Sequence, residues 1–494
     1  MNLAPNKLCF DNFQAIRRSK FTRYFYLKDG VNMSLTKNNH EQRYNISSTA
    51  QNKMENWFSI PKKIILLVTI FGIIQFSFSF WNNLRGPGFT HFSQGIELTL
   101  QERDLSLIDN QRTLVMSHSE ESNYIIARNK LEGHGYTHFD SSTNTYKPFA
   151  FHSSFTVFLY EALISSGLDF DIFIILYFLV AATLHSISLL AIFQILRNLG
   201  QNYAVLGLCS WALFPPTIYF INPLFLYESI CTAAIIIIYE RIHAGRITGY
   251  ATKKDLVIII MLSAMGVFFR LTVIPILLSL FMVTIIFPGK LKRSHLISGI
   301  TIIIAFISIM CLPVLEKNQR DFGSAVLSTQ MGFVLWEGSN PIARGSWDGS
   351  GKVEKLGLSS VSNIENLNQL EISHHLRHQA LEFAFNHPLD YFVINLRKLA
   401  IFFLPQNYGV MPGSRFYNPI NAIVYISFLI FTIGSIFRKK DIKNTMVLIS
   451  PILASITLTL IFIVGYRWRF YAEPFMIICM VHLFYNFMTK RQKV

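Results

Sequence analysis

Long apolar stretches alternate with short polar loops along this chain, and the pattern predicts a bundle of membrane-spanning helices. A helix needs about 17–25 mostly apolar residues to cross a bilayer. Ten stretches approach or reach that length, at residues 64–83, 172–196, 203–221, 224–240, 255–270, 272–287, 296–313, 417–436, 445–465 and 471–488. Two further apolar stretches, 149–166 and 390–405, either span the bilayer or dip into one leaflet. We therefore expect an all-α polytopic membrane protein.

The basic loops decide between these alternatives, because loops rich in Lys and Arg tend to stay on the cytoplasmic side. The loops at 241–254, 288–295 and 437–444 are basic, as is the C-terminal tail. All of them fall on the cytoplasmic side only if 149–166 and 390–405 do not cross. The expectation is therefore ten transmembrane helices with both termini inside, plus two half-inserted helices.

Two large loops then lie on the outer side of the membrane, at residues 84–148 and 314–390. The first loop has eight acidic residues against six basic ones, which suits a non-cytoplasmic side. The second contains the segment LWEGSNPIARGSWDGSG, in which Trp336 and Trp347 favour an ordered binding loop over a flexible linker.

The composition supports a membrane protein and argues against nucleic-acid binding. Of 494 residues, 51% are hydrophobic and only 15% are charged, whereas an average soluble domain has about 25% charged residues. The net charge of +15 collects in the short loops and in residues 1–60, so it follows the expected topology. The five cysteines show no metal-binding or disulfide spacing, and we expect them to be packing residues.

Residues 1–60 form a polar, basic extension ahead of the membrane domain, which we place at 61–490. Eleven Lys and Arg stand against four acidic residues up to Lys63, and no signal-peptide core precedes Ile64. Two interpretations stay open: the extension is a disordered cytoplasmic tail, or translation starts at Met54.

Ionisable side chains gather where this topology puts the outer membrane face. They are Glu120, Glu121, Lys147, Glu228, Arg270, Arg467 and Arg469. Charges at membrane depth are costly and usually lie with partners or in a polar cavity. Arginine can grip a phosphate and stabilise it as a leaving group, and a carboxylate can take the proton of an attacking hydroxyl. The set suits transfer of a sugar from a polyprenyl phosphate, with inversion at the anomeric carbon.

The order of these residues resembles the GT-C superfamily of membrane glycosyltransferases, in its bacterial protein-mannosyltransferase-like and lipid A aminoarabinose-transferase-like branch. In the first outer loop that family has an acidic pair, a tyrosine, Ala-Arg and Gly-x-Gly-Tyr. The matching positions here are Glu120-Glu121, Tyr124, Ala127-Arg128 and Gly133-His-Gly135-Tyr136. The family next has a basic residue and Pro that open a half-inserted helix, and Lys147-Pro148 match them here. Later motifs match in the same order, at Glu228, the segment from Gly338 through Asn340 to Gly345, His387-Pro388, Lys398, and Arg467-Trp-Arg469 with Pro474.

The resemblance implies a multi-pass glycosyltransferase of the bacterial inner membrane whose active site lies on the outer face. Its donor is a polyprenyl-phosphate sugar, its acceptor is a lipid, glycan or protein hydroxyl, and nucleic acid is not a partner. Donor phosphate is expected at Lys147, Arg270, Arg467 and Arg469. Substrate is expected at Tyr124, Glu228, Asn340 and Lys398.

The acidic pair departs from the family pattern at its first position, which is usually Asp and here is Glu120. Glu120 aligns with the general base, but the longer side chain leaves open whether Glu120 or Glu121 takes the proton. Glu121 alternatively shapes the site or holds a divalent cation, and no other cofactor is expected. The histidines His118, His134, His138 and His152 match no metal-ligand spacing.

Each candidate also has a structural interpretation. The acidic pair caps the helix expected at 122–130, Glu228 pairs with Arg270 or a lysine, and Asn340 shapes a turn. Arginines near the face snorkel to lipid headgroups. Two other functions stay open: a flippase or transporter of lipid-linked sugars, and a non-catalytic scaffold of polysaccharide assembly. A transporter would place its site at the bilayer midplane, whereas these charges lie near one face.

Overall fold

The computed structural model describes most of the membrane domain. The described residues are 60–85, 118–140, 145–150, 154–167, 170–214, 226–249, 251–345, 352–359, 367–403, 417–437, 442–464 and 469–491. The chain divides into the units Met1–Asn56 and Trp57–Val494. All described residues belong to the second unit, so the expected N-terminal extension lies outside them apart from Ile60.

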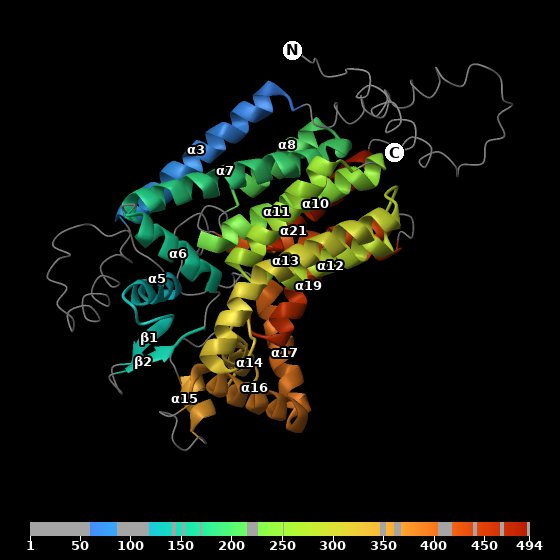
Figure 1. The fold of residues 1–494 in the computed structure, drawn as a ribbon. Helices are drawn as coiled ribbons and strands as arrows, with labels where there is room; N and C mark the ends of the chain where they lie inside the picture. The colour runs from blue at the N-terminus through green and yellow to red at the C-terminus, as the bar shows by residue number, and fades with distance from the viewer. Residues whose placement is uncertain are drawn as a thin grey trace, which may run out of the picture. The chain divides into compact units, whose positions relative to one another are not determined.

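Ten helices correspond to the ten apolar stretches (Figure 1). They are α3 (Lys62–Arg85), α7 (Phe170–Leu196), α8 (Gln201–Ala212), α10 (Leu226–Thr248), α11 (Lys253–Phe269), α12 (Val273–Ile286), α13 (Arg293–Phe322), α18 (Tyr417–Phe437), α19 (Ile442–Ile461) and α21 (Glu473–Arg491). The two stretches expected to be half-inserted form α6 (Ser154–Ser166) and α17 (Pro388–Phe403). A short 3-10 turn, η1 (Arg197–Leu199), joins α7 to α8.

Length and hydropathy within the described ranges qualify three helical segments as candidate membrane spans. They are Phe178–Leu199, Arg293–Phe322 and Ile442–Ile461. The prediction of an all-α membrane protein is confirmed, with one local exception in the first outer loop. There, β1 (Thr137–Asp140) and β2 (Thr145–Pro148) form an antiparallel hairpin.

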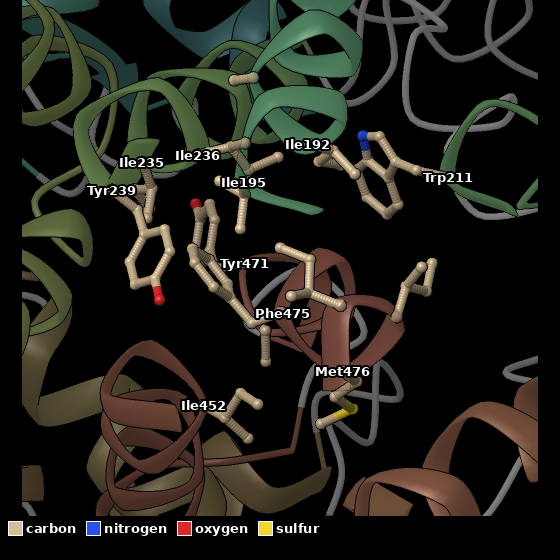
Figure 2. Close-up of a cluster of buried hydrophobic side chains, with 14 of the residues drawn as sticks. Ile192, Ile195, Trp211, Ile235, Ile236, Tyr239, Ile452, Tyr471, Phe475 and Met476 are labelled. Atoms are coloured by element: carbon tan, nitrogen blue, oxygen red, sulfur yellow. The ribbon is translucent and has the colours of Figure 1, made fainter. Parts of the chain in front are cut away.

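A continuous apolar core joins α7, α8, α10, α19 and α21. Figure 2 shows Ile192 of α7 near Trp211 of α8, with Tyr471 and Phe475 across from Ile236 of α10. Every residue from Tyr227 to Glu240 in α10 is buried. A helix that is apolar on all sides belongs at the centre of its bundle, which explains the isoleucine run in α10.

The basic loops meet at one end of this bundle. Arg246, near the end of α10, donates from Nε to the Phe287 carbonyl at 3.0 Å and from Nη2 to Asn444 Oδ1 at 3.2 Å. The Arg246 carbonyl accepts from the Lys290 backbone N–H at 3.0 Å. Loops that the charge pattern assigns to the cytoplasm therefore touch each other. Glu228 of α10 and Lys317 of α13 lie near the ends of their helices that are farthest from these basic loops.

The second outer loop folds into α14 (Gln330–Gly338), α15 (Lys352–Leu358) and α16 (Gln369–Asn386). Their shared core contains Leu335, Trp336, Val353, Leu376 and Ala380. Trp336 Nε1 donates to the Val353 carbonyl at 2.7 Å. Trp336 is thus a core residue of this small helical unit, while Trp347 lies outside the described residues.

We predict that Gly332→Ala destabilises the protein. Helices α14 and α16 approach so closely there that an added Cβ would overlap the Ser373 carbonyl. Such overpacking typically costs about 1–3 kcal/mol. Gly434→Ala in α18 is the matched control, because a Cβ there meets nothing within 4 Å, and helix propensity favours Ala by roughly 1 kcal/mol. Thermal unfolding in detergent should show a lower midpoint only for Gly332→Ala, and equal midpoints would contradict the prediction.

Candidate functional site

The acidic pair lies within the first turn of helix α5 (His118–Leu131). The helix begins four residues earlier than the expected start at residue 122, so Glu120 and Glu121 are part of it rather than ahead of it. A first-turn position favours carboxylates through the helix dipole, and that interaction is compatible with a role as a base. The side chains of both residues lie outside the described part of the chain.

Tyr124 lies on the next turn of α5, where it joins the contact between α5 and α6. Its ring meets that of Tyr160 edge to face at 6.0 Å between centroids. Ile126 and Ala127 are fully buried in the same contact. The Tyr and Ala positions of the motif therefore pack the helix that carries the acidic pair, and Tyr124 is half-buried. Whether Tyr124 contacts substrate stays a prediction.

The Gly-His-Gly sequence ends α5 and turns the chain into the hairpin. Gly133 and Gly135 have φ of 92° and 73°, which favour glycine because it lacks a Cβ. The Gly133 N–H donates to the Lys130 carbonyl at 3.1 Å, and the His134 N–H donates to the Asn129 carbonyl at 2.9 Å. These two bonds form a Schellman motif, so the motif serves as a helix stop.

Lys147 and Pro148 were expected to open a half-inserted helix, and the structure places them differently. They end strand β2, where Lys147 pairs with His138 across the hairpin, and α6 begins only at Ser154. The prediction of the helix start was wrong, because the hairpin uses these residues for its ladder. Whether the Lys147 ammonium binds phosphate stays a prediction.

A charged cluster that the sequence did not reveal joins this hairpin to the bundle. The Tyr136 hydroxyl donates to Glu161 Oε2 at 3.0 Å, and the Lys130 ammonium contacts Glu161 Oε1. The Lys317 ammonium lies 4.9 Å from the centre of the Tyr136 ring and 3.1 Å from Asp321 Oδ2. Burial, followed by the hydrogen bond to Glu161, raises the pKa of Tyr136, so its hydroxyl remains a donor. One feature of the sequence could have pointed to this cluster: Glu161 is a lone acidic residue in an apolar stretch, where a charged side chain usually has a partner.

Glu228 and Arg270 form an ion pair at the end of the bundle opposite the basic loops. Arg270 Nη2 lies 2.9 Å from Glu228 Oε1, and the Glu228 side chain is 1% exposed. The Arg270 guanidinium also lies 5.4 Å from the centre of the Tyr227 ring. The structural interpretation, in which Glu228 pairs with Arg270, is therefore confirmed. Contact of either residue with a donor stays a prediction.

Arg469 forms a second buried ion pair, with a partner that was not predicted. Its Nε donates to Glu473 Oε1 at 3.0 Å, and the Tyr425 hydroxyl donates to the same oxygen at 2.9 Å. Glu473 and Arg469 are almost fully buried. Tyr471, between them in sequence, lies within electrostatic reach of Glu228 and Arg270. The two ion pairs thus occupy the same end of the bundle, while Arg467 lies outside the described residues.

Asn340 shapes its own turn. Its Nδ2 donates to the Trp336 carbonyl at 2.7 Å, and its Oδ1 accepts from the Ile342 backbone N–H at 2.9 Å. The residue is fully buried. These bonds favour the turn interpretation of Asn340. Whether the loop that Asn340 shapes also binds substrate stays a prediction.

Lys398 brings three separate parts of the chain together. Its ammonium donates to the Leu460 carbonyl at the end of α19, at 3.0 Å. Its aliphatic chain lies against Gly345, where an added Cβ would come within 3.3 Å of Lys398 Cγ. The Val464 N–H in turn donates to the Gly345 carbonyl at 2.9 Å. The Asn340–Gly345 loop, helix α17 and residues 460–464 therefore converge on one point.

The Lys398 side chain is fully buried, yet no carboxylate pairs with it among the residues that the structure describes. Burial lowers its pKa from 10.5 to about 8. Helix α17 is not one of the candidate spans. The ammonium is held by this carbonyl and lies 5.9 Å from the centre of the Tyr391 ring. Buried charges are normally paired with an opposite charge, and an anionic ligand would supply one.

The two outer loops meet at Ala150. The Ala150 carbonyl accepts from the Thr329 N–H at 2.9 Å, and its own N–H donates to Gln369 Oε1 at 2.9 Å. This contact joins the segment after β2 to the helical unit of the second loop. Within the described ranges no three His, Cys, Asp or Glu side chains form a group suited to a metal ion.

The low pKa of Lys398 generates a pH prediction. Its folded-state pKa lies below its unfolded value, so the cost of burying the charge, about 3 kcal/mol, is present at pH 7. That cost disappears as the pH rises from about 8 to 10.5, because the folded protein then releases the proton first. Lys398→Met should therefore unfold at a higher temperature than the wild type at pH 7, with the difference shrinking towards pH 10. Arg397→Met, which changes an exposed neighbour, should follow the wild-type pH profile. Parallel profiles for Lys398→Met and the wild type would contradict the prediction.

Comparison with known proteins gives one structural similarity. No family model matches the sequence, and no curated protein matches it. Among solved structures, the chain is similar to the archaeal oligosaccharyltransferase AglB from Archaeoglobus fulgidus, determined in complex with an inhibitory peptide and a dolichol-phosphate. The TM-score is 0.39 and the sequence identity 12%, over 87% of this chain and 52% of that one. The chain thus spans about half the length of that protein.

Proposed function

We propose that this protein is a membrane glycosyltransferase of the GT-C type, which moves a sugar from a polyprenyl phosphate to an acceptor hydroxyl. The reaction takes place on the outer face of the membrane and inverts the anomeric carbon. Lys398, Arg469 and Arg270 hold the donor phosphate, and one glutamate of the Glu120–Glu121 pair is the general base. A lipid, a glycan or a protein supplies the acceptor hydroxyl.

One observation carries this proposal: the convergence of separate segments on the buried ammonium of Lys398. The Asn340–Gly345 loop, α17 and residues 460–464 come from three parts of the chain and meet at a cation without a described counter-ion. A phosphate monoanion or dianion is the kind of ligand that such a site favours. Because the site lies at an end of the bundle, a lipid-anchored phosphate can reach it from the bilayer.

The two buried ion pairs fit the same chemistry. A guanidinium held by a carboxylate keeps a fixed position, and a fixed positive charge stabilises the negative charge that develops on a leaving phosphate. Arg270 is held by Glu228, and Arg469 by Glu473. Glu228 is then a counter-ion to Arg270. The site requires no nucleotide, since nucleotide sugars are not supplied on the outer face.

Donor specificity provides the first test. Purified protein in lipid nanodiscs should transfer sugar from polyprenyl-phosphate donors prepared with several sugars, and should not use the corresponding nucleotide sugars. The measurement is mass spectrometry of glycans and of released polyprenyl phosphate, with a membrane lysate as the source of acceptor. Turnover of a nucleotide sugar alone would refute the proposal, because a phosphate site at the membrane end could not explain it.

The acidic pair provides the second test. Glu120→Gln keeps the size of the side chain and removes the proton acceptor, so turnover should fall by about 10²-fold or more while donor affinity changes little. Glu120→Asp, which restores the usual residue of the family, should stay active, and Arg469→Ala should weaken donor binding and turnover together. If Glu121→Gln is inactive while Glu120→Gln is not, Glu121 is the base. Full activity of both variants would refute a catalytic role, and the pair would then serve only to stabilise the start of α5.

A further inference from the structure

Helices α16 and α17 present an apolar stripe that nothing in the described chain covers. Phe385 and Leu389 are each 80% exposed, and Phe392 is 60% exposed. The complete stripe consists of Leu381, Phe385, Leu389, Phe392, Val393 and Leu396. The sequence placed residues 314–390 in a water-facing loop, yet the stripe begins nine residues before the stretch expected to touch the bilayer at 390.

The stripe consists of one face from each helix. Leu381 and Phe385 lie four residues apart on one face of α16, and the members on α17, from Leu389 to Leu396, share one face of that helix. The two helices meet at His387, whose φ of −126° and ψ of 58° are not helical. The His387 N–H donates to the Phe383 carbonyl at 2.9 Å at the end of α16, and the His387 carbonyl accepts from the Tyr391 N–H at 3.0 Å at the start of α17, so the two faces adjoin at this residue.

The opposite faces of both helices are already used. On α16, Leu376, Ala380 and Phe383 are buried, and α16 packs against α14. On α17, Lys398 and Phe402 are fully buried where the helix packs against α19. The exposed stripe is thus the remaining face of a unit that is anchored on a candidate membrane span.

Charge distinguishes the two ends of the stripe. On α16 the exposed side chains of His374, Arg377 and His378 precede Leu381 and Phe385, so the face changes from polar, with a fixed positive charge at Arg377, to apolar along the helix. The acidic neighbours face histidines: Glu382 Oε2 lies 3.8 Å from His378 Nδ1, and Asp390 Oδ2 lies 3.9 Å from His387 Nδ1. A helix with this gradient suits the boundary between anionic headgroups and acyl chains.

We propose that the end of α16 and the start of α17 enter the outer leaflet together, with Phe385 and Leu389 among the acyl chains and Arg377 at the headgroup phosphates. The occupant of the stripe is the bilayer, and anionic lipid deepens the insertion. Contact therefore extends into α16, beyond the half-inserted helix that the hydrophobic pattern predicts. This inference does not depend on the proposed enzymatic function.

Spin labels at single cysteines test the proposal in nanodiscs made from the full chain. Cys9 and Cys209 are replaced by serine, while the buried Cys231, Cys311 and Cys479 are kept, and this parent gives the labelling background. Labels are placed by Phe385→Cys and Leu389→Cys, with His374→Cys as the control on the same face of α16. Power saturation then compares collision with oxygen, which partitions into lipid, and with a nickel chelate, which stays in water.

Collisions with oxygen should exceed those with nickel at positions 385 and 389, and the ratio should invert at 374. Adding phosphatidylglycerol to phosphatidylcholine should raise the oxygen-to-nickel ratio at 385, and Arg377→Gln should abolish that rise. A higher nickel signal at 385 and 389 means that water covers the stripe and overturns the proposal. Low collision with both reagents means that protein, such as a second copy, covers it, and overturns the proposal equally. An unchanged ratio on adding phosphatidylglycerol overturns the role given to anionic lipid.

Discussion

The energetic cost of burying charge is the constraint on which this structure depends. A charged group taken out of water must find a partner, because its desolvation costs several kcal/mol. At one end of the bundle Arg270 is paired with Glu228, and Arg469 is paired with Glu473. An ion pair of this kind about offsets its own desolvation, whereas removal of one partner costs roughly 3–5 kcal/mol. The Glu228–Arg270 pair therefore specifies that α10 lies beside the end of α11 more than it stabilises the fold, whereas the Arg469–Glu473 pair joins residues only four apart at the start of α21.

Lys398 is the exception to this pairing among the described residues. It contacts a backbone carbonyl and the edge of the Gly345 turn, and its positive charge has no described carboxylate beside it. Burying a charged ammonium lowers the stability of the folded protein, since burial favours the neutral form of lysine. In the proposed function, binding of the donor phosphate offsets this cost.

The position of the first outer loop follows from a small number of polar contacts. Helix α5, which carries the acidic pair, packs on α6, and the cluster of Lys130, Tyr136, Glu161 and Lys317 connects that pair of helices to the end of α13. The hydrogen bonds of Ala150 then connect the same region to the second outer loop. Because both loops are attached to a common point, the helix that carries the acidic pair is held in a defined position relative to the second outer loop.

The sequence by itself determined the class of the protein and the approximate bounds of its membrane helices. Apolar runs such as the one in α10 specify buried helices whatever their neighbours are, because hydrophobic burial and internal hydrogen bonding are local properties of the segment. Only the tertiary structure decided that Arg469 pairs with Glu473, that Lys147 belongs to a strand, and that Lys317 stacks on Tyr136. Lys317 and Tyr136 are far apart in sequence, whereas Arg469 and Glu473 are four residues apart and Lys147 pairs with His138 across a short hairpin. In all three cases hydropathy has no information about which polar groups meet. The site motifs were therefore visible one at a time in the sequence, while their convergence on Lys398 depends on how the helices pack.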